Sequence, residues 1–159
     1  MGGSLILLAL ATGAFVFGHF VLSSFPVRSR IVDAVGEGIF RGLYSLFAAF
    51  ALVWMILEYN SAPYIRLWEV EVFGPPVILI FMLFACIFFV CSVTTRNPTL
   101  AGMDGLHETL EPGRGIYAVT RHPMLSAFAL WAVAHLFVRG DAAATIFFGG
   151  FFLLSTFGM

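Results

Sequence analysis

Residues 75–95 read PPVILIFMLFACIFFVCSVTT, a stretch without a single charged side chain. A helix needs about 20 mostly apolar residues to cross the hydrocarbon core of a bilayer, with a usual range of about 17–25. Proline is tolerated in the first turn of a helix, so Pro75 and Pro76 mark where this helix begins. The stretch therefore predicts a helix that spans a membrane.

Four other segments meet the same criterion, and the composition of the whole chain agrees with them. Of the 159 residues, 60% are hydrophobic and 11% are charged, whereas a soluble domain is about half apolar and about a quarter charged. We therefore expect an all-α fold, a polytopic transmembrane bundle of about five helices that forms one domain over residues 1–159. The other predicted spans cover about residues 4–24, 39–59, 123–139 and 142–159.

The first and the last apolar segments are interpreted separately. The first apolar segment lacks the basic n-region of a signal peptide and is longer than the usual apolar region of one, so we interpret it as a span. The last segment stays apolar to Met159 without a basic flank. That bare end favours a chain truncated at its C-terminus.

The arginines predict the orientation of the bundle. Cytoplasmic loops of membrane proteins carry an excess of Lys and Arg, and six of the eight arginines flank the loops near residues 25–38 and 96–121. Both loops lie on one side only if the N-terminus is outside. We therefore expect the N-terminus of this integral membrane protein to lie outside. We expect the membrane to be a bacterial inner membrane. The six arginines are Arg28, Arg30, Arg41, Arg96, Arg114 and Arg121.

The charged residues and the cysteines limit the classes of partner that the protein could bind. The chain has no basic run or basic face, which excludes nucleic acid as a partner. Cys86 and Cys91 lie in one apolar segment and lack the spacing of a zinc site. Glu37 and Arg41 are four residues apart and predict an ion pair at the start of a helix. The expected partners are the lipid bilayer and an apolar or lipid-like small-molecule substrate.

Two histidines, His19 and His135, lie inside predicted spans. Ionisable groups are costly within a membrane and by default indicate function. Neutral imidazole is suited to bind haem iron inside a helix bundle. The residues alone leave two interpretations open. The histidines are axial ligands of a haem iron, or they hydrogen-bond to neighbouring helices and stabilise the bundle.

The depth of these two histidines conflicts with a shared iron. In the predicted orientation, His19 lies in the cytoplasmic half of its helix. His135 lies 12 residues after Pro123, or about 18 Å along the axis, toward the outer half. Two ligands of one iron must lie at similar depth. The simple topology and the paired-ligand interpretation therefore conflict, and both stand as expectations.

A second candidate site lies at the cytoplasmic start of the predicted fourth span. Arg114, Arg121 and His122 precede or flank Pro123, and the N-terminus of a helix presents free N–H groups that favour anions. One interpretation is a site for a carboxylate or phosphate. The other is that the arginines orient the helix and contact lipid headgroups.

Several short motifs resemble the NnrU family of membrane proteins, and together they cover nearly the whole chain. The most specific part is the fourth span with the turn after it, where Arg139-Gly140-Asp141 predicts a tight hairpin to the fifth span. The motifs are GHFVLSS at 18–24, Gly36-Glu37 with RGLYS at 41–45, TRHPM at 120–124, LWAVAHL at 130–136, Arg139-Gly140-Asp141, and FGGF at 148–151.

The resemblance implies a cofactor and two lines of activity. Bacterial NnrU members are associated with denitrification and nitric oxide metabolism. Plant and cyanobacterial relatives are 15-cis-zeta-carotene isomerases that carry haem b, and their axial histidines match His19 and His135 here. The resemblance therefore implies a metal site of haem iron only, held by this pair. It assigns no catalytic residue.

Two alternatives remain beside the haem-dependent isomerase. Gly115-x-Tyr117 followed by Arg121-His122-Pro123 also resembles the isoprenylcysteine and phospholipid methyltransferases, in which this region helps bind S-adenosylmethionine. Those enzymes use acidic residues beyond the next helix, which this chain does not reach. The other alternative is a non-catalytic membrane scaffold or accessory protein.

Overall fold

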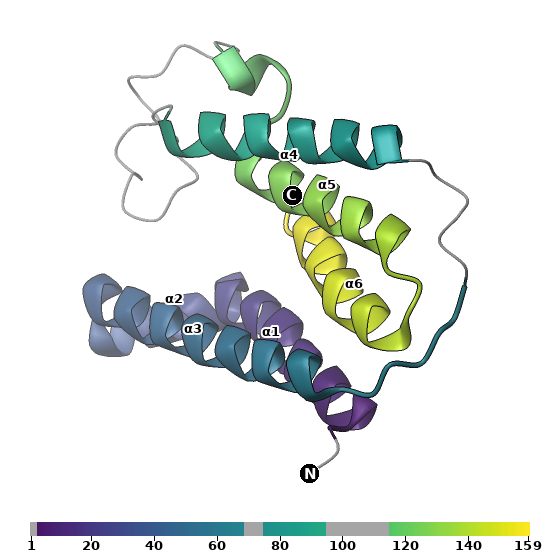
Figure 1. Ribbon diagram of the computed structural model, residues 1–159. Helices are drawn as coiled ribbons and strands as arrows, with labels where there is room; N and C mark the ends of the chain where they lie inside the picture. The colour runs from purple at the N-terminus through teal and green to yellow at the C-terminus, as the bar shows by residue number, and fades with distance from the viewer. Residues whose placement is uncertain (1–2, 69–74, 95–114) are drawn as a thin grey trace. The chain divides into compact units, whose positions relative to one another are not determined.

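The computed structural model describes residues 3–68, 75–94 and 115–159. In these residues the chain forms six α-helices, one short 3-10 helix and no strand, so the predicted all-α fold is confirmed (Figure 1). Five helices match the five predicted spans to within two residues at each end. The elements are α1 (Leu5–Ser23), α2 (Phe25–Val35), α3 (Glu37–Ser61), α4 (Pro75–Thr94), η3 (Gly115–Ala118), α5 (Pro123–Val138) and α6 (Ala142–Phe157).

The helices differ in their capacity to cross a membrane. In the described part of the chain, α1, α3 and α4 are long and apolar enough to do so. Helices α5 and α6 are equally apolar but have 16 residues each. At 1.5 Å per residue they rise about 24 Å, less than the hydrocarbon thickness of about 30 Å. The predicted fourth and fifth spans are therefore the shorter members of the bundle.

The chain divides into two compact units. The first comprises Met1–Glu69 with Gly140–Gly150, and the second comprises Val70–Arg139 with Phe151–Met159. Helix α6 contributes its first half to the first unit and its second half to the other. His19 therefore belongs to the first unit and His135 to the second.

In the first unit, α1 and α3 pack as an antiparallel pair. The Gly3 amide donates to the Ser61 carbonyl oxygen at 3.1 Å, which places the start of α1 beside the end of α3. The Ser4 side chain caps α1 by accepting from the Ile6 amide at 3.2 Å. The core between the helices is apolar, since Leu8 and Met55 are fully buried there.

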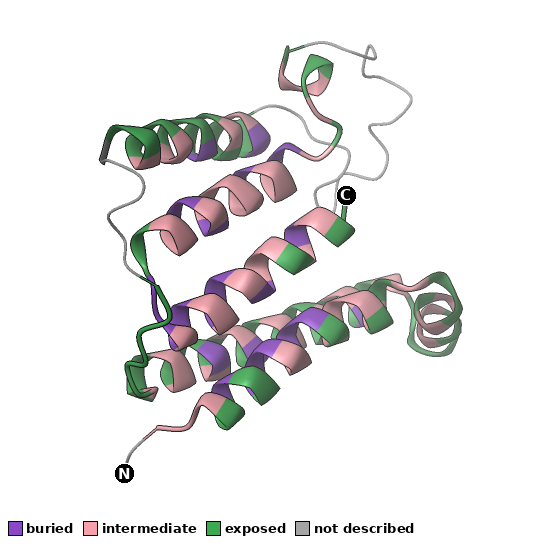
Figure 2. Ribbon diagram, turned by 90° about the vertical axis from the view of Figure 1, so that its right-hand side faces the viewer, coloured by how far each residue is buried: buried purple, intermediate pink, exposed green. Residues whose placement is uncertain are grey.

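The segment that links α1 to α3 was predicted as a loop, and the structure shows helix α2 there. Pro26 lies in the first turn of α2, the position where proline suits a helix. Gly36, with φ of 85°, separates α2 from α3 in a conformation that favours glycine. None of the α2 residues is buried, so α2 lies on the surface of its unit (Figure 2).

The turn between α5 and α6 is tied to the segment that follows α3. The Leu67 amide donates to the Gly140 carbonyl oxygen at 2.7 Å, and the Ala142 amide donates to the Ile65 carbonyl oxygen at 2.8 Å. The buried Asp141 carboxylate caps α6 by accepting from the Ala144 amide at 2.9 Å. The predicted turn is thus confirmed, and backbone bonds hold it in place.

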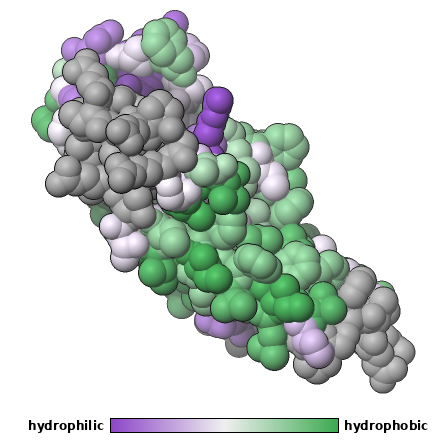
Figure 3. Space-filling model, turned by 90° about the horizontal axis from the view of Figure 1, so that it is seen from above, coloured by the Kyte–Doolittle hydropathy of each residue, from purple (hydrophilic) through white to green (hydrophobic). Residues whose placement is uncertain are grey.

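In the second unit, α4 and α5 pack side by side and run antiparallel (Figure 1). Phe81 meets Phe137 near one end of the pair, and Phe89 meets Phe128 nearer the other, with ring centroids 5.7 Å and 6.2 Å apart. Many large apolar side chains of α4 are exposed. Green apolar side chains cover much of the face seen in Figure 3, as expected for a surface in contact with lipid.

Candidate functional site

His19 lies one turn before the end of α1 and is anchored to its own helix. Its Nδ1 atom lies 2.6 Å from the carbonyl oxygen of Phe15. A carbonyl oxygen only accepts, so Nδ1 carries the proton and donates it, and the lone pair of the ring lies on Nε2. The Phe15 ring packs edge-on against the imidazole with centroids 4.5 Å apart. The ring orientation and the tautomer of His19 are therefore both determined locally.

His135 repeats this arrangement near the end of α5. Its Nδ1 atom donates to the carbonyl oxygen of Trp131 at 2.8 Å, and the indole packs against the imidazole at 4.8 Å. In both helices the partner is the aromatic residue four positions earlier, because helical side chains lean toward the preceding turn. The two predicted histidines thus have the same tautomer, with the proton on Nδ1.

Aromatic residues of α3 complete the surroundings of His19. The Tyr44 ring meets the imidazole edge-on at 5.5 Å, and Phe40 lies 6.0 Å from Tyr44 on the same face of α3. Gly18 allows this approach, because a Cβ atom there would overlap the Phe47 ring of α3. The His19 imidazole is therefore half-buried in an aromatic environment at the α1–α3 contact.

This geometry suits a histidine that binds a metal. Metal-binding histidines almost always donate their other ring N–H to a carbonyl, carboxylate or water, which sets the tautomer and raises the basicity of the ligating nitrogen. A carbonyl oxygen has this role at both His19 and His135. In the described ranges no group of three or more His, Cys, Asp or Glu residues is placed to hold a metal ion. Haem iron takes only one or two ligands from the protein.

The two histidines lie in different units of the chain. Each imidazole is oriented by a hydrogen bond to a carbonyl oxygen of its own helix, and this bond is the same in both. The expectation that they bind one iron together stays a prediction.

The second predicted site is assembled only in part. His122 is the N-cap residue of α5 and Pro123 the first helical residue, as predicted, but the imidazole does not cap the helix. Thr120 Oγ1 accepts from the His122 amide at 3.2 Å and lies 3.0 Å from Ser126 Oγ. Arg121 is exposed, and Arg114 lies outside the described residues. The anion site therefore stays a prediction.

Tyr117, in the 3-10 helix before α5, is the residue that the methyltransferase resemblance singles out. Its hydroxyl is shielded from solvent and has no hydrogen-bond partner in the described part of the chain. Burial raises the pKa of the Tyr117 phenol above its ordinary value. The phenol is therefore neutral at physiological pH.

The predicted Glu37–Arg41 ion pair is confirmed, and a second arginine joins it. Glu37 Oε1 lies 2.8 Å from Arg41 Nε and 2.7 Å from Arg28 Nη2, which comes from α2. The Arg28 guanidinium also lies 5.7 Å from the centroid of the Phe40 ring. These contacts attach α2 to the start of α3, at the end of the unit where His19 lies.

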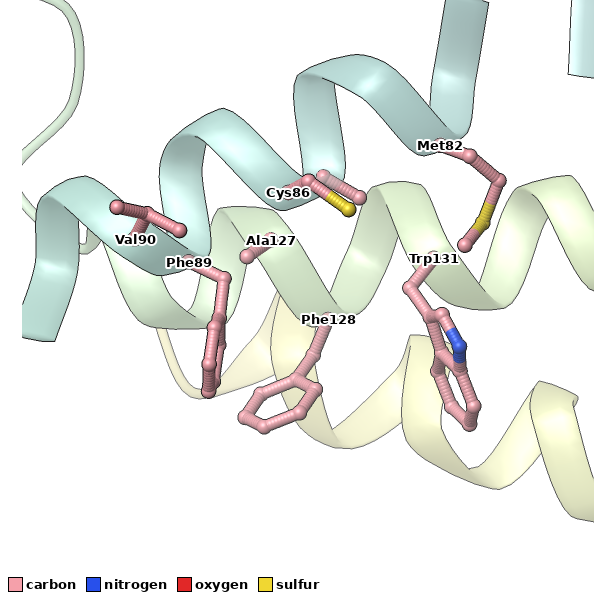
Figure 4. A pocket seen from close by; sticks show the side chains of 8 residues that line it. Met82, Cys86, Phe89, Val90, Ala127, Phe128 and Trp131 are labelled. Atoms are coloured by element: carbon pink, nitrogen blue, oxygen red, sulfur yellow. The ribbon is translucent and has the colours of Figure 1, made fainter. Parts of the chain in front are cut away.

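The second unit also holds an apolar pocket that we did not predict. It has a volume of about 200 Å³ and lies between α4 and α5 (Figure 4). Trp131 both lines the pocket and supplies the carbonyl that anchors His135. Finding it requires the register of α4 against α5, which no local pattern contains. The lining residues are Met82, Ala85, Cys86, Phe89, Val90, Ala127, Phe128 and Trp131.

Comparison with known families identifies a match over nearly the whole chain. A family model described as NnrU protein matches residues 7–159, nearly the whole chain. No curated protein and no solved structure matches it.

Proposed function

The chain belongs to the NnrU family, and from that premise we propose that it binds haem b within the membrane. In this proposal His19 and His135 would hold the iron, each through Nε2. One observation supports this above all: each Nδ1 atom donates to the carbonyl oxygen four residues earlier, at 2.6 Å and 2.8 Å. This bond prepares a histidine for a metal.

The protein's contribution is to orient the ligands and to exclude water. The carbonyl oxygens of Phe15 and Trp131 hold the imidazoles in one tautomer, and the rings of the same residues pack against them. Tyr44 adds a second aromatic wall at His19. Bound haem supplies an iron whose redox potential depends on such ligands and surroundings.

For the activity we propose a haem-dependent isomerisation of an apolar or lipid-like substrate, as the resemblance to the carotene isomerases implies. A role in nitric oxide or denitrification metabolism is the other activity associated with the family. The S-adenosylmethionine-dependent methyltransferase and the non-catalytic scaffold are the alternatives without haem.

Absorption spectroscopy of the full chain, purified in detergent from haem-replete cells, tests the cofactor. We expect a Soret band with low-spin, six-coordinate features. His19→Ala and His135→Ala should each remove one ligand and shift the iron to high spin, or release the haem. His122→Ala is the matched control, because His122 lies in the same unit as His135 but its imidazole makes no cap contact. Its spectrum should be unchanged.

Other outcomes would distinguish the alternatives. Folded, active protein without haem would exclude the haem proposal, and binding of S-adenosylmethionine by that protein would favour the methyltransferase. Binding of neither haem nor S-adenosylmethionine would be consistent with the scaffold. A Soret band that depends on His122 and not on His135 would keep haem but refute the ligand assignment.

We also propose an N-out orientation in the bacterial inner membrane, which the arginine distribution supports. In a background without Cys86 and Cys91, Ala34→Cys on α2 and Asn60→Cys at the end of α3 place thiols at exposed positions. A membrane-impermeant maleimide added to intact spheroplasts should label position 60 and not position 34. Labelling of position 34 alone would reverse the orientation.

A further inference from the structure

The pocket between α4 and α5 includes a small residue from each helix in its lining. Ala85 of α4 and Ala127 of α5 are buried and form its inner wall. Cys86, Phe89 and Val90 line it as well but are exposed. The pocket therefore has a floor of small side chains, with larger side chains of α4 and α5 around it (Figure 4).

The chemistry of the lining selects an apolar occupant. The eight described residues that line the pocket include no charged side chain. A ligand with several polar groups would lose its hydrogen bonds to water there, which is costly. Met82 adds a flexible and polarisable side chain that adapts to irregular apolar shapes. Three aromatic rings, those of Phe89, Phe128 and Trp131, form the remaining wall.

Size and depth indicate a hydrocarbon chain from the bilayer. The volume of about 200 Å³ exceeds that of an engineered apolar cavity of about 150 Å³ that binds benzene. Helix α4 is one of the helices long enough to span the membrane. Met82 lies about 10 Å along the axis from Pro75, and Val90 lies about 6 Å from Thr94. The pocket is thus at the depth of acyl chains and not of headgroups.

We propose that this pocket binds an acyl chain of a bilayer phospholipid, which contacts Trp131. The proposal does not depend on haem. The headgroup of the lipid remains at the membrane surface. The pocket therefore discriminates between lipids by the shape of their acyl chains. A lipid held here contacts the residue whose carbonyl anchors His135.

Fluorescence of Trp131 tests the site, because bromine on an acyl chain quenches an indole that it contacts. The sequence has three tryptophans, so Trp54→Phe with Trp68→Phe leaves Trp131 alone. The full chain in detergent is titrated with phosphatidylcholine brominated in mid-chain, against the same lipid without bromine. We expect quenching that saturates. Cys86→Phe, which fills the pocket, should weaken the apparent affinity about tenfold or more.

Ile87→Phe is the matched control, because Ile87 is exposed on α4 and does not line the pocket. Its titration should match that of the parent protein. Quenching that rises linearly without saturation, or that is equal in the Cys86→Phe variant, would overturn the proposal. Saturable binding of brominated stearic acid without binding of the phospholipid would also overturn it, because the ligand would then be a free fatty acid.

A second measurement needs no bulky substitution. In a Cys91→Ala background, Cys86 is the remaining thiol, and its alkylation by N-ethylmaleimide reports access to the pocket. A saturating concentration of unbrominated phosphatidylcholine should slow this reaction about tenfold. An unchanged rate would contradict the proposal.

Discussion

The phenyl ring of Phe47 on α3 occupies the space that a side chain at Gly18 of α1 would take. Gly18 directly precedes His19, and Phe47 lies one turn after Tyr44, whose ring meets the His19 imidazole at 5.5 Å. Small residues let membrane helices approach closely, and contact there depends on van der Waals packing. The Gly18–Phe47 contact therefore brings the aromatic wall of α3 to the proposed ligand.

Gly18→Ala should separate α1 from α3 and weaken both the fold and haem retention. Overpacking of this kind costs about 1–3 kcal/mol. Unfolding in a detergent titration measures the stability, and the Soret band measures haem content. Gly42→Ala is the control, because a Cβ at Gly42 meets nothing within 4 Å. Equal stability of the two variants would contradict the close-packing argument.

Gly140→Ala should loosen the turn between α5 and α6. A Cβ at this position would overlap the carbonyl oxygen of Trp68, a backbone atom that has little freedom to move. We expect a loss of about 1–3 kcal/mol in the free energy of unfolding, measured in the same titration. Gly149→Ala has open space around its Cβ and should be neutral or slightly stabilising. A destabilised Gly149 variant beside an unaffected Gly140 variant would refute the prediction.

Glu37→Gln removes the charge that Arg28 and Arg41 share. The three side chains are partly exposed, so we expect a loss of stability of only about 0.2–1 kcal/mol. The loss should shrink in 1 M salt, where the Debye length falls to about 3 Å. Urea or detergent unfolding at low and high salt measures this. A loss that is independent of salt would mean that packing of α2, and not charge, carries the effect.

Thr120→Val keeps the shape of the side chain before α5 and removes the oxygen that accepts from the His122 amide. Loss of such a helix-start contact costs about 0.5–2 kcal/mol. Thr156→Val is the matched control, because the Thr156 hydroxyl bonds the Phe152 carbonyl one turn earlier within α6. Thermal unfolding of both variants should show the larger loss for Thr120→Val. A reversed order would refute the capping role.

Helix α2 shows where local patterns mislead. The segment that carries Arg28 and Arg30 was predicted as a loop between two spans. Arg28 instead turns toward α3, where it meets Glu37 at 2.7 Å and the Phe40 ring at 5.7 Å. The partly exposed Arg28 side chain thus pairs with a partner from another helix. That partner is nine residues away, beyond the reach of any pattern within one helix.

Sequence alone determined where the apolar helices lie and that two of them carry a histidine. Whether a segment enters a bilayer depends on the free energy of transferring its own side chains from water to hydrocarbon. Residues 75–94 carry no charged side chain, so this free energy is favourable whatever the other helices do. The bonds of His19 to Phe15 and of His135 to Trp131 also follow from helix geometry once each helix is assigned. These features are local, so the order of residues suffices to predict them.

Tertiary structure alone decided what surrounds those residues. The contact of Tyr44 with His19, the attachment of Gly140 to the segment after α3, and the pocket between Ala85 and Ala127 each join residues far apart in the chain. In a bilayer, apolar side chains gain little by exchanging lipid for protein, so hydrophobicity does not specify which helix packs on which. The fit of small residues against large ones specifies it, and that fit exists only after the helices have met.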